Sequence, residues 1–332
     1  MPASAAHRGD LPGPGEPLAE VVRGGFVESV HLGHLVLLDG DGTELLRRGR
    51  PDGTFFARSS LKPLQAVGML RAGLDLRDGE LALACASHSG EPRHVEVARA
   101  VLAGAGLDEA SLRNTPDLPL GPAASLAWQR AGGTAAAVTQ NCSGKHAAML
   151  ATCVAARWPT ETYLDPEHPL QRAVRAAVED LTGERVAVVS VDGCGAPLFS
   201  CSLTGLARAF ARIATAPPAS PEGRVAAAMR AHPGLVGGTG RDVTLAMEAV
   251  PGLVAKDGAE GVYAAALPDG AALAFKVSDG SGRARPPVLG AALRLAGVPA
   301  SQVAGWSEVP VLGHGHPVGE VRPWSSPAQD AS

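Results

Sequence analysis

The chain has 332 residues, 45% of them hydrophobic and 19% charged, a balance typical of a globular protein with one large domain or two moderate ones. The formal net charge of −4, without basic blocks, argues against nucleic acid or an anionic membrane as a partner. No stretch approaches the roughly twenty apolar residues of a membrane-spanning helix, so we expect none.

The start of the chain and its cysteines indicate the compartment. Met1–Pro17 is rich in proline and glycine and lacks the apolar centre of a secretory signal. We expect a disordered tail over residues 1–20 and a single domain over residues 21–325. Five cysteines in a long chain without a signal argue against a disulfide framework, so the protein is expected to be cytoplasmic.

The first ordered elements surround a serine and a lysine. A β-hairpin is predicted by Leu35–Leu38, an Asp-Gly turn over residues 39–42, and Leu45–Leu46. Downstream, Ser59 and Lys62 form an S-x-x-K pair, and residues three apart share one face of a helix. Apolar residues at helical spacing predict that a helix begins here.

This serine–lysine pair has two interpretations. A serine hydroxyl becomes a nucleophile when a base takes its proton, and a neutral Lys62 amine one turn away would serve Ser59. Desolvation or a second cation would favour the neutral amine. An isolated S-x-x-K is more often a serine that caps a helix followed by an exposed lysine, so the catalytic interpretation depends on the segments that accompany it.

Apolar spacing and turn residues predict the remaining elements. Residues 104–139 give only weak signals. In chain order we expect a buried strand over Leu81–Ala86 ending at Ser87, a helix from Pro92, a helix after Lys145 and His146 through Val154, a helix over Leu170–Leu181, a buried strand over Val186–Val191 that runs into Asp192, a helix over Leu206–Ile213, a helix that ends at Ala231, strands over Val254–Gly258 and Leu273–Val277, and a last helix from Pro286 or Pro287.

Five segments of the chain are distinctive when taken together. They are Arg58-Ser59-x-x-Lys62, Cys85-Ala86-Ser87-His88-Ser89, Asn141 to His146, Asp192-Gly193-Cys194 and Lys256. The most specific of them is the string Asn-Cys-Ser-Gly-Lys-His at residues 141–146. These segments resemble a known family, the zinc-containing asparaginase II group of the Rhizobium etli type, and the resemblance runs from about Gly24 to the last strands.

The resemblance implies an α+β fold of αβα layers, similar to serine β-lactamases and glutaminases, with helices flanking a largely antiparallel sheet. It also implies a homodimer, L-asparagine as the substrate, and one zinc ion. The implied roles are Ser59 as nucleophile with Lys62 as base, Ser87 and Lys256 as a second serine–lysine pair, Cys142, Lys145 and Cys194 as zinc ligands, and Arg58, His146 and Asp192 as substrate contacts.

Elementary chemistry supports part of this assignment. Two lysines in one desolvated site repel, which pushes at least one amine toward its neutral form. Arg58 suits a substrate α-carboxylate, and Asp192 suits an α-ammonium. Thiolates are good zinc ligands, whereas lysine is a rare one. Spacing alone leaves open whether Cys142 and Cys194 bind metal or are core thiols.

The sequence therefore favours a cytoplasmic L-asparaginase with a Ser-Lys acyl-enzyme mechanism, and two alternatives stay open. One is a penicillin-recognising serine hydrolase, because Ser87-His88-Ser89 and Lys256-Asp257-Gly258 follow the S-x-x-K pair in that class's motif order, although both depart from its patterns. The other is a non-catalytic zinc- or redox-responsive binding module that uses Cys142 and Cys194.

Overall fold

The computed structural model describes residues 13–325, and its main feature is an eight-stranded sheet whose pairings are all antiparallel. Seven strands follow the order β10-β11-β1-β2-β9-β8-β7, and β3 pairs with β2 outside this path. The strands are β1 (Glu16–Arg23), β2 (Phe26–Leu38), β3 (Glu44–Arg48), β7 (Val254–Asp257), β8 (Val262–Ala266), β9 (Ala272–Val277), β10 (Val309–Gly313) and β11 (His316–Pro323).

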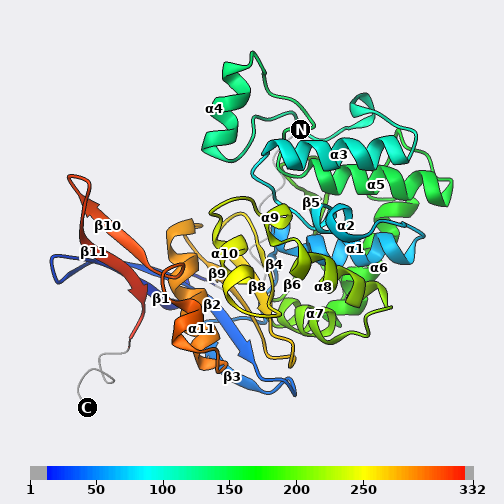
Figure 1. The fold of residues 1–332 in the computed structure, drawn as a ribbon. Coiled ribbons are helices and arrows are strands. Elements are labelled where there is room, and N and C mark those ends of the chain that lie inside the picture. The colour runs from blue at the N-terminus through cyan, green and yellow to red at the C-terminus, as the bar shows by residue number, and fades with distance from the viewer. Residues whose placement is uncertain (1–12, 326–332) are drawn as a thin grey trace, which may run out of the picture.

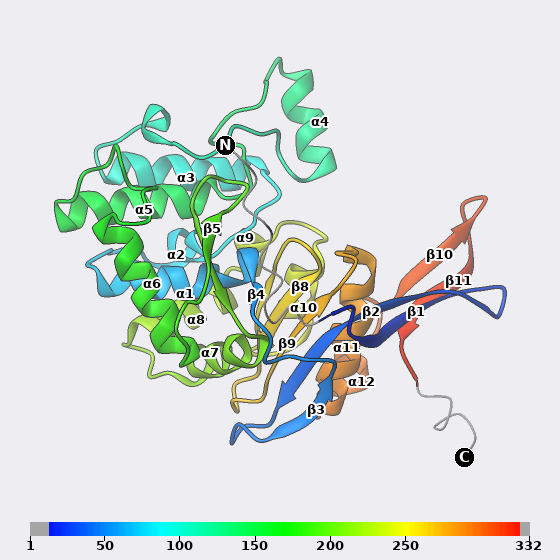
Figure 2. The same cartoon turned by 180° about the vertical axis from the view of Figure 1, so that it is seen from behind.

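Helices cover both faces of this sheet, which confirms the expected α+β class. On one side α7 packs against β2, β8 and β9, and α1, α2, α3, α5, α6 and α8 extend this layer. On the opposite side α11 packs against β1 and β11 (Figures 1 and 2). The helices are α1 (Lys62–Arg71), α2 (Asp78–Ala84), α3 (Pro92–Gly104), α4 (Pro122–Arg130), α5 (Ser143–Ala156), α6 (Pro169–Thr182), α7 (Leu203–Thr215), α8 (Pro221–Ala231), α9 (Pro233–Val236), α10 (Asp242–Ala249), α11 (Arg285–Leu295) and α12 (Ala300–Val303), with short 3-10 helices at η1 (Arg58–Leu61), η2 (Glu109–Ser111) and η3 (Gly282–Ala284).

A second, three-stranded sheet brings two distant segments to one place. Its order is β4 (Phe55–Phe56), β6 (Pro197–Cys201) and β5 (Val189–Val191), and both pairings are antiparallel. The chain enters η1 directly after β4 and reaches Asp192 directly after β5. The small sheet therefore places Arg58 and Asp192 just beyond the ends of the two strands that flank β6.

Local chemistry explains the elements that were predicted correctly. The hairpin of β2 and β3 forms around Asp39, whose Oδ1 accepts from the backbone N–H groups of Asp41 and Thr43, and Gly42 supplies a positive φ of 83°. A proline stands in the first turn of α1, α3 and α6, where its missing N–H costs nothing. Gly183 ends α6 in the left-handed region.

Three predictions need correction. Leu81–Ala86 is mostly helix α2, because a short buried apolar run has the same periodicity in either state, and Asp78 and Glu80 lie in the first turn of that helix. The strand expected over Val186–Val191 is only β5, and it is exposed. The expected tail, residues 1–20, ends earlier, because β1 begins at Glu16 and buries Leu18 and Ala19; residues 1–12 lie outside the described residues.

Helix α4 stands apart from the rest of the helical layer: it buries none of its residues and projects from the body of the molecule (Figure 1). Among residues 13–325, no helix is both long enough and apolar enough to span a membrane.

Candidate active site

Buried lysines mark the candidate site. The chain has 29 Lys and Arg residues, but only four of them are lysines. Three of the four, Lys62, Lys145 and Lys256, are 2% exposed or less. An arginine cannot give up its proton in a protein, whereas a buried lysine can. Three lysines withdrawn from water in one region mark a candidate site for proton chemistry. Burial opposes the charged form of Lys145, but Cys194 and Cys142 raise its pKa. Burial lowers the pKa of Lys256.

Lys62 connects two of the predicted segments. It is the first residue of α1, and its Nζ donates to Ala86 O at 2.5 Å, to Ser87 Oγ at 3.1 Å and to Cys142 Sγ at 3.1 Å. Ser59 lies one turn earlier in η1 and is partly exposed. In the described chain Lys62 forms no hydrogen bond with Ser59, so the serine that it contacts is Ser87.

Lys256 lies at the end of β7 on the other side of η1. Ser60 Oγ donates to Lys256 O at 3.1 Å, which ties β7 to the turn that carries Ser59. Lys256 Nζ donates to Asp257 O at 2.6 Å and to Asp257 Oδ1 at 2.5 Å. Burial lowers the pKa of Lys256, Asp257 raises it and the nearby Lys62 lowers it further, and the balance brings this pKa to about 8.

Arg58 and Asp192 form an ion pair beside Ser59. Arg58 Nε donates to Asp192 Oδ1 at 2.8 Å, and the two side chains are 26% and 11% exposed. Burial raises the pKa of Asp192, but Lys145 and Arg58 together bring it below its usual value. Arg58 has a φ of 51°, a left-handed conformation that is uncommon for residues other than glycine. Backbone strain of this kind concentrates at functional sites.

The three predicted zinc ligands lie together. Cys142 caps α5, Lys145 follows in its first turn, and Lys145 Nζ donates to Cys194 Sγ at 3.3 Å. Hydrogen bonding with Cys142 and the Lys145 ammonium lower the pKa of Cys194 to about 4. Within residues 13–325, no three His, Cys, Asp or Glu side chains are arranged to hold a metal ion. Two sulfurs and one amine nitrogen fit zinc, provided that Lys145 gives up its proton.

His146 is fully buried next to this cluster. Its Nδ1 lies 2.8 Å from Tyr163 Oη, while the described residues offer its Nε2 no hydrogen-bond partner. Burial and then the Lys145 ammonium lower the pKa of His146 well below its usual value, so the imidazole is neutral. An unpaired buried nitrogen is costly, so it indicates a position where a ligand atom binds.

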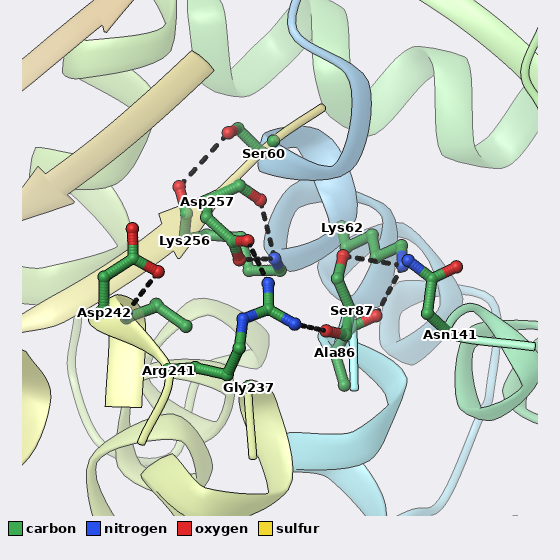
Figure 3. A network of polar contacts seen from close by, with 12 residues as sticks. Ser60, Lys62, Ala86, Ser87, Asn141, Gly237, Arg241, Asp242, Lys256 and Asp257 are labelled. Carbon is green, nitrogen blue, oxygen red and sulfur yellow. Dashed lines mark hydrogen bonds and ion pairs between the residues drawn. The ribbon is translucent and has the colours of Figure 1, made fainter. Parts of the chain in front are cut away.

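The structure also shows a group of charged side chains that the sequence did not predict. It consists of Arg241, Asp242, Asp257 and Arg285. Arg241 Nη2 donates to Asp257 Oδ2 at 2.7 Å (Figure 3). Arg285 Nε lies 3.0 Å from Asp242 Oδ2. The available signal was an aspartate directly after Lys256 at the end of a buried strand.

Arg241 and Arg285 also line a cavity of about 770 Å³ next to Gly121 and α4. None of the ten predicted site residues lines this cavity. The cavity is therefore a neighbour of the lysine cluster and not its interior.

Among the comparisons with known proteins, one identifies a family. The model of the family described as L-asparaginase II matches residues 19–323, nearly the whole chain. No curated protein matches the chain.

Two solved structures have a distant similarity to the chain. A crystal structure of Mglu in its native form is 15% identical, with a TM-score of 0.43, over 80% of this chain and 64% of that one. EstCE1, a hydrolase with promiscuous acyltransferase activity, is 12% identical, with a TM-score of 0.38, over 82% and 91% of the two chains. The chain thus spans less than two thirds of the length of the first structure.

Proposed function

Because the chain belongs to the L-asparaginase II family, we propose that it is an asparaginase-type amidohydrolase that splits L-asparagine into L-aspartate and ammonia. The observation that supports this proposal most is the burial of three of the four lysines beside Ser59 and Ser87. Such an arrangement supplies a hydroxyl nucleophile and an amine that can accept its proton.

The proposed reaction has two steps. Ser59 Oγ attacks the side-chain amide carbon of the substrate, and its proton passes to the Lys62 amine and then to the departing ammonia. Water then attacks the acyl-enzyme and gives one proton to the same amine. As the bond to Ser59 Oγ breaks, the amine passes this proton to Oγ, and aspartate leaves. Ser59 is preferred because it is the more exposed serine and follows Arg58. The bond from Lys62 to Ser87 makes Ser87 the alternative nucleophile.

The amino-acid part of the substrate is proposed to bind at Arg58, Asp192 and His146. Arg58 offers a cation to an α-carboxylate, and Asp192 offers an anion to an α-ammonium. Their existing ion pair, 2.8 Å long, holds the two charges at a spacing that a zwitterion can match. The unpaired Nε2 of His146 supplies a further polar contact.

We also propose one zinc ion per chain, held by Cys142, Lys145 and Cys194. When bound, zinc would fix these ligands in place and, through them, the neighbouring His146 and Asp192, as ligand-orienting partners do in other metal sites. Serine and lysine already supply the nucleophile and the base, so the metal tunes substrate binding. A cytoplasmic location and a homodimer complete the proposal; sedimentation of purified protein tests the dimer, and fractionation of the producing cells tests the location.

The first test is ammonia release from L-asparagine by purified protein and by Ser59→Ala. The variant should lose activity by at least about 100-fold, because without the hydroxyl no acyl-enzyme forms. Its free energy of unfolding should change by no more than about 0.5 kcal/mol, because a partly exposed hydroxyl is lost. Ser87→Ala is the matched comparison.

The pair of variants separates the possible outcomes. Substantial turnover by folded Ser59→Ala together with an inactive Ser87→Ala would move the nucleophile to Ser87. Covalent labelling of Ser59 by a fluorescent penicillin, without ammonia release, would favour the penicillin-recognising hydrolase. No turnover of either substrate class by folded wild-type protein would leave the binding module.

A further inference from the structure

Arg241 joins the two segments that carry Ser87 and Lys256. It lies in the loop between α9 and α10, at the N-terminal cap of α10. Its Nη2 donates to Asp257 Oδ2 at 2.7 Å, and its Nη1 donates to Ser87 O at 3.4 Å. Figure 3 shows the guanidinium between the Lys256–Asp257 pair and the Ala86–Ser87 segment. One planar group thus bridges two chain segments from opposite sides of the site.

The carboxylate that Arg241 holds is also the one that orients Lys256. Asp257 is fully buried, and its Oδ1 accepts from Lys256 Nζ at 2.5 Å. Arg285 approaches the other oxygen, Asp257 Oδ2, at 3.5 Å. With Arg241 in place, Oδ2 of Asp257 is taken up by the two arginines, and the Lys256 amine is held at Oδ1.

We infer that Arg241 is a positioning residue of the proposed amidohydrolase: by holding both the Asp257 carboxylate and the Ser87 carbonyl, it fixes the place and the proton of the Lys256 amine and the position of the Ser87 backbone. A catalytic role for Arg241 rests on the proposed function. The two hydrogen bonds of Arg241, to Asp257 Oδ2 and to Ser87 O, are here called the clamp, and they do not depend on that function.

Several elements contribute the charges that face Lys256. Asp257 comes from β7 itself, Lys62 from α1 and Arg241 from the loop before α10. Cys85, at the end of α2, also faces it, but burial raises the pKa of this thiol to about 12, which keeps it neutral. Asp242, Arg285 and the buried Tyr263 of β8 act on Lys256 through Asp257.

The sign of the effect follows from these charges. Arg241 is a cation near Lys256, so its loss removes a repulsion that favours the neutral amine. The same loss leaves Asp257 more fully available to Lys256, which favours the ammonium. Both changes raise the pKa of Lys256. A merely structural role for Arg241 would lower activity or stability without this shift.

The experiment compares Arg241→Gln with Arg99→Gln, a control that removes the same charge from the exposed face of α3. Arg99 is about half exposed and pairs with Glu109. We expect the acidic limb of kcat/KM to move to higher pH by about one unit in Arg241→Gln. In Arg99→Gln it should stay in place. An unmoved limb in a folded Arg241→Gln protein would overturn the inference.

A second readout is independent of activity. The four lysines give few signals in protein labelled with ¹³C at the lysine ε-carbon, and Lys256→Met identifies the one of interest. Its titration should move upward in Arg241→Gln by the same amount as the kinetic limb. If wild-type protein released no ammonia, the proposed function would fail while this titration still tested the clamp.

Arg241→Lys covers the case in which Arg241→Gln does not fold. An ammonium keeps the cation beside Asp257, but its single nitrogen does not reproduce the two separate Nη donors with which Arg241 contacts Ser87 O and Asp257 Oδ2. We expect the pH limb to stay near that of the wild type and kcat/KM to fall about tenfold or more, because the Ser87 segment is no longer held. Normal kcat/KM in Arg241→Lys would overturn the inference.

Discussion

Lysine and arginine have different uses in this chain, and the difference is visible residue by residue. The molecular surface carries arginines in ion pairs such as Arg47 with Glu44 and Arg99 with Glu109. Lysine is almost confined to the interior, where Lys62 donates to Ser87 Oγ and Lys256 donates to Asp257 Oδ1. An amine that must lose and regain a proton explains this division, since a guanidinium stays charged.

This division predicts that arginine cannot replace either of the two site lysines, Lys62 and Lys256. Lys62→Arg and Lys256→Arg should each lower kcat/KM by at least about 100-fold, as much as alanine would, because a guanidinium accepts no proton. Lys276→Arg is the matched control: it changes the remaining lysine, which is only half-buried on β9. Near-normal turnover in either site variant would show that the lysine serves only as a cation.

The pH dependence follows from the same residues. A pKa of about 8 leaves roughly one tenth of Lys256 neutral at pH 7 and most of it neutral at pH 9. In the proposed mechanism Lys62 is the base for Ser59, and the second lysine, Lys256, is proposed to act as a neutral amine, so kcat/KM should rise as pH increases through 8 and then level off. A flat profile between pH 7 and pH 9 would contradict a role for the neutral Lys256 amine.

At the scale of elements, prediction from sequence succeeded where local chemistry decides the structure. Local residues determine the structure in three places: the hairpin around Asp39, the start of α1 at its proline, and the end of α6 at its glycine. It failed where packing decides. Leu81–Ala84 is helical because it packs against α5 and α8, and no periodicity within four residues encodes that contact.

The glycine of the string Asn-Cys-Ser-Gly-Lys-His has such a packing role. A β-carbon on Gly144 would lie 2.5 Å from Leu83 Cγ and 2.6 Å from Leu83 O, so α5 approaches α2 closely there. Gly144→Ala should lower the free energy of unfolding by about 1 to 3 kcal/mol through this overlap. The loss is expected because the backbone oxygen of Leu83 cannot move aside as a side chain can. Urea denaturation measures the change in the free energy of unfolding.

Gly104→Ala is the matched control, because Gly104 ends α3 and a β-carbon there would meet nothing within 4 Å. The same substitution should leave the stability unchanged or raise it by up to about 1 kcal/mol, as alanine favours helix. Equal stability losses in the two variants would mean that the Leu83 contact is not the cause.

At the scale of the whole molecule, the candidate site is a junction between layers. The small sheet supplies Arg58 and Asp192, the helical layer supplies Lys62 and Lys145, and the large sheet supplies Lys256. The motif residues were visible in the sequence because each stands in a distinctive local string. Arg241 was not visible, because its bond to Ser87 joins positions 154 residues apart and a glycine-rich loop carries no distinctive pattern.

Zinc binding tests this junction directly, since the proposed ligands come from α5 and from the turn after β5. Purified wild-type protein should carry one zinc per chain by elemental analysis. Cys194→Ala and Cys142→Ala should lose the metal and raise KM by roughly 10- to 100-fold, with a smaller loss in kcat, because substrate contacts at Asp192 and His146 are no longer held. A chelator should lower the thermal midpoint of the wild type but not of these variants.

Cys153→Ala provides the control, because Cys153 is a buried thiol on the same helix α5 and lies in the main apolar core. It should keep its zinc and its KM, with only the small stability loss of a shortened core side chain. Cys194 and Cys142 differ from it by facing Lys145 and Lys62. Zinc well below one per chain, with unchanged kinetics in both site variants, would make these two cysteines core thiols as well.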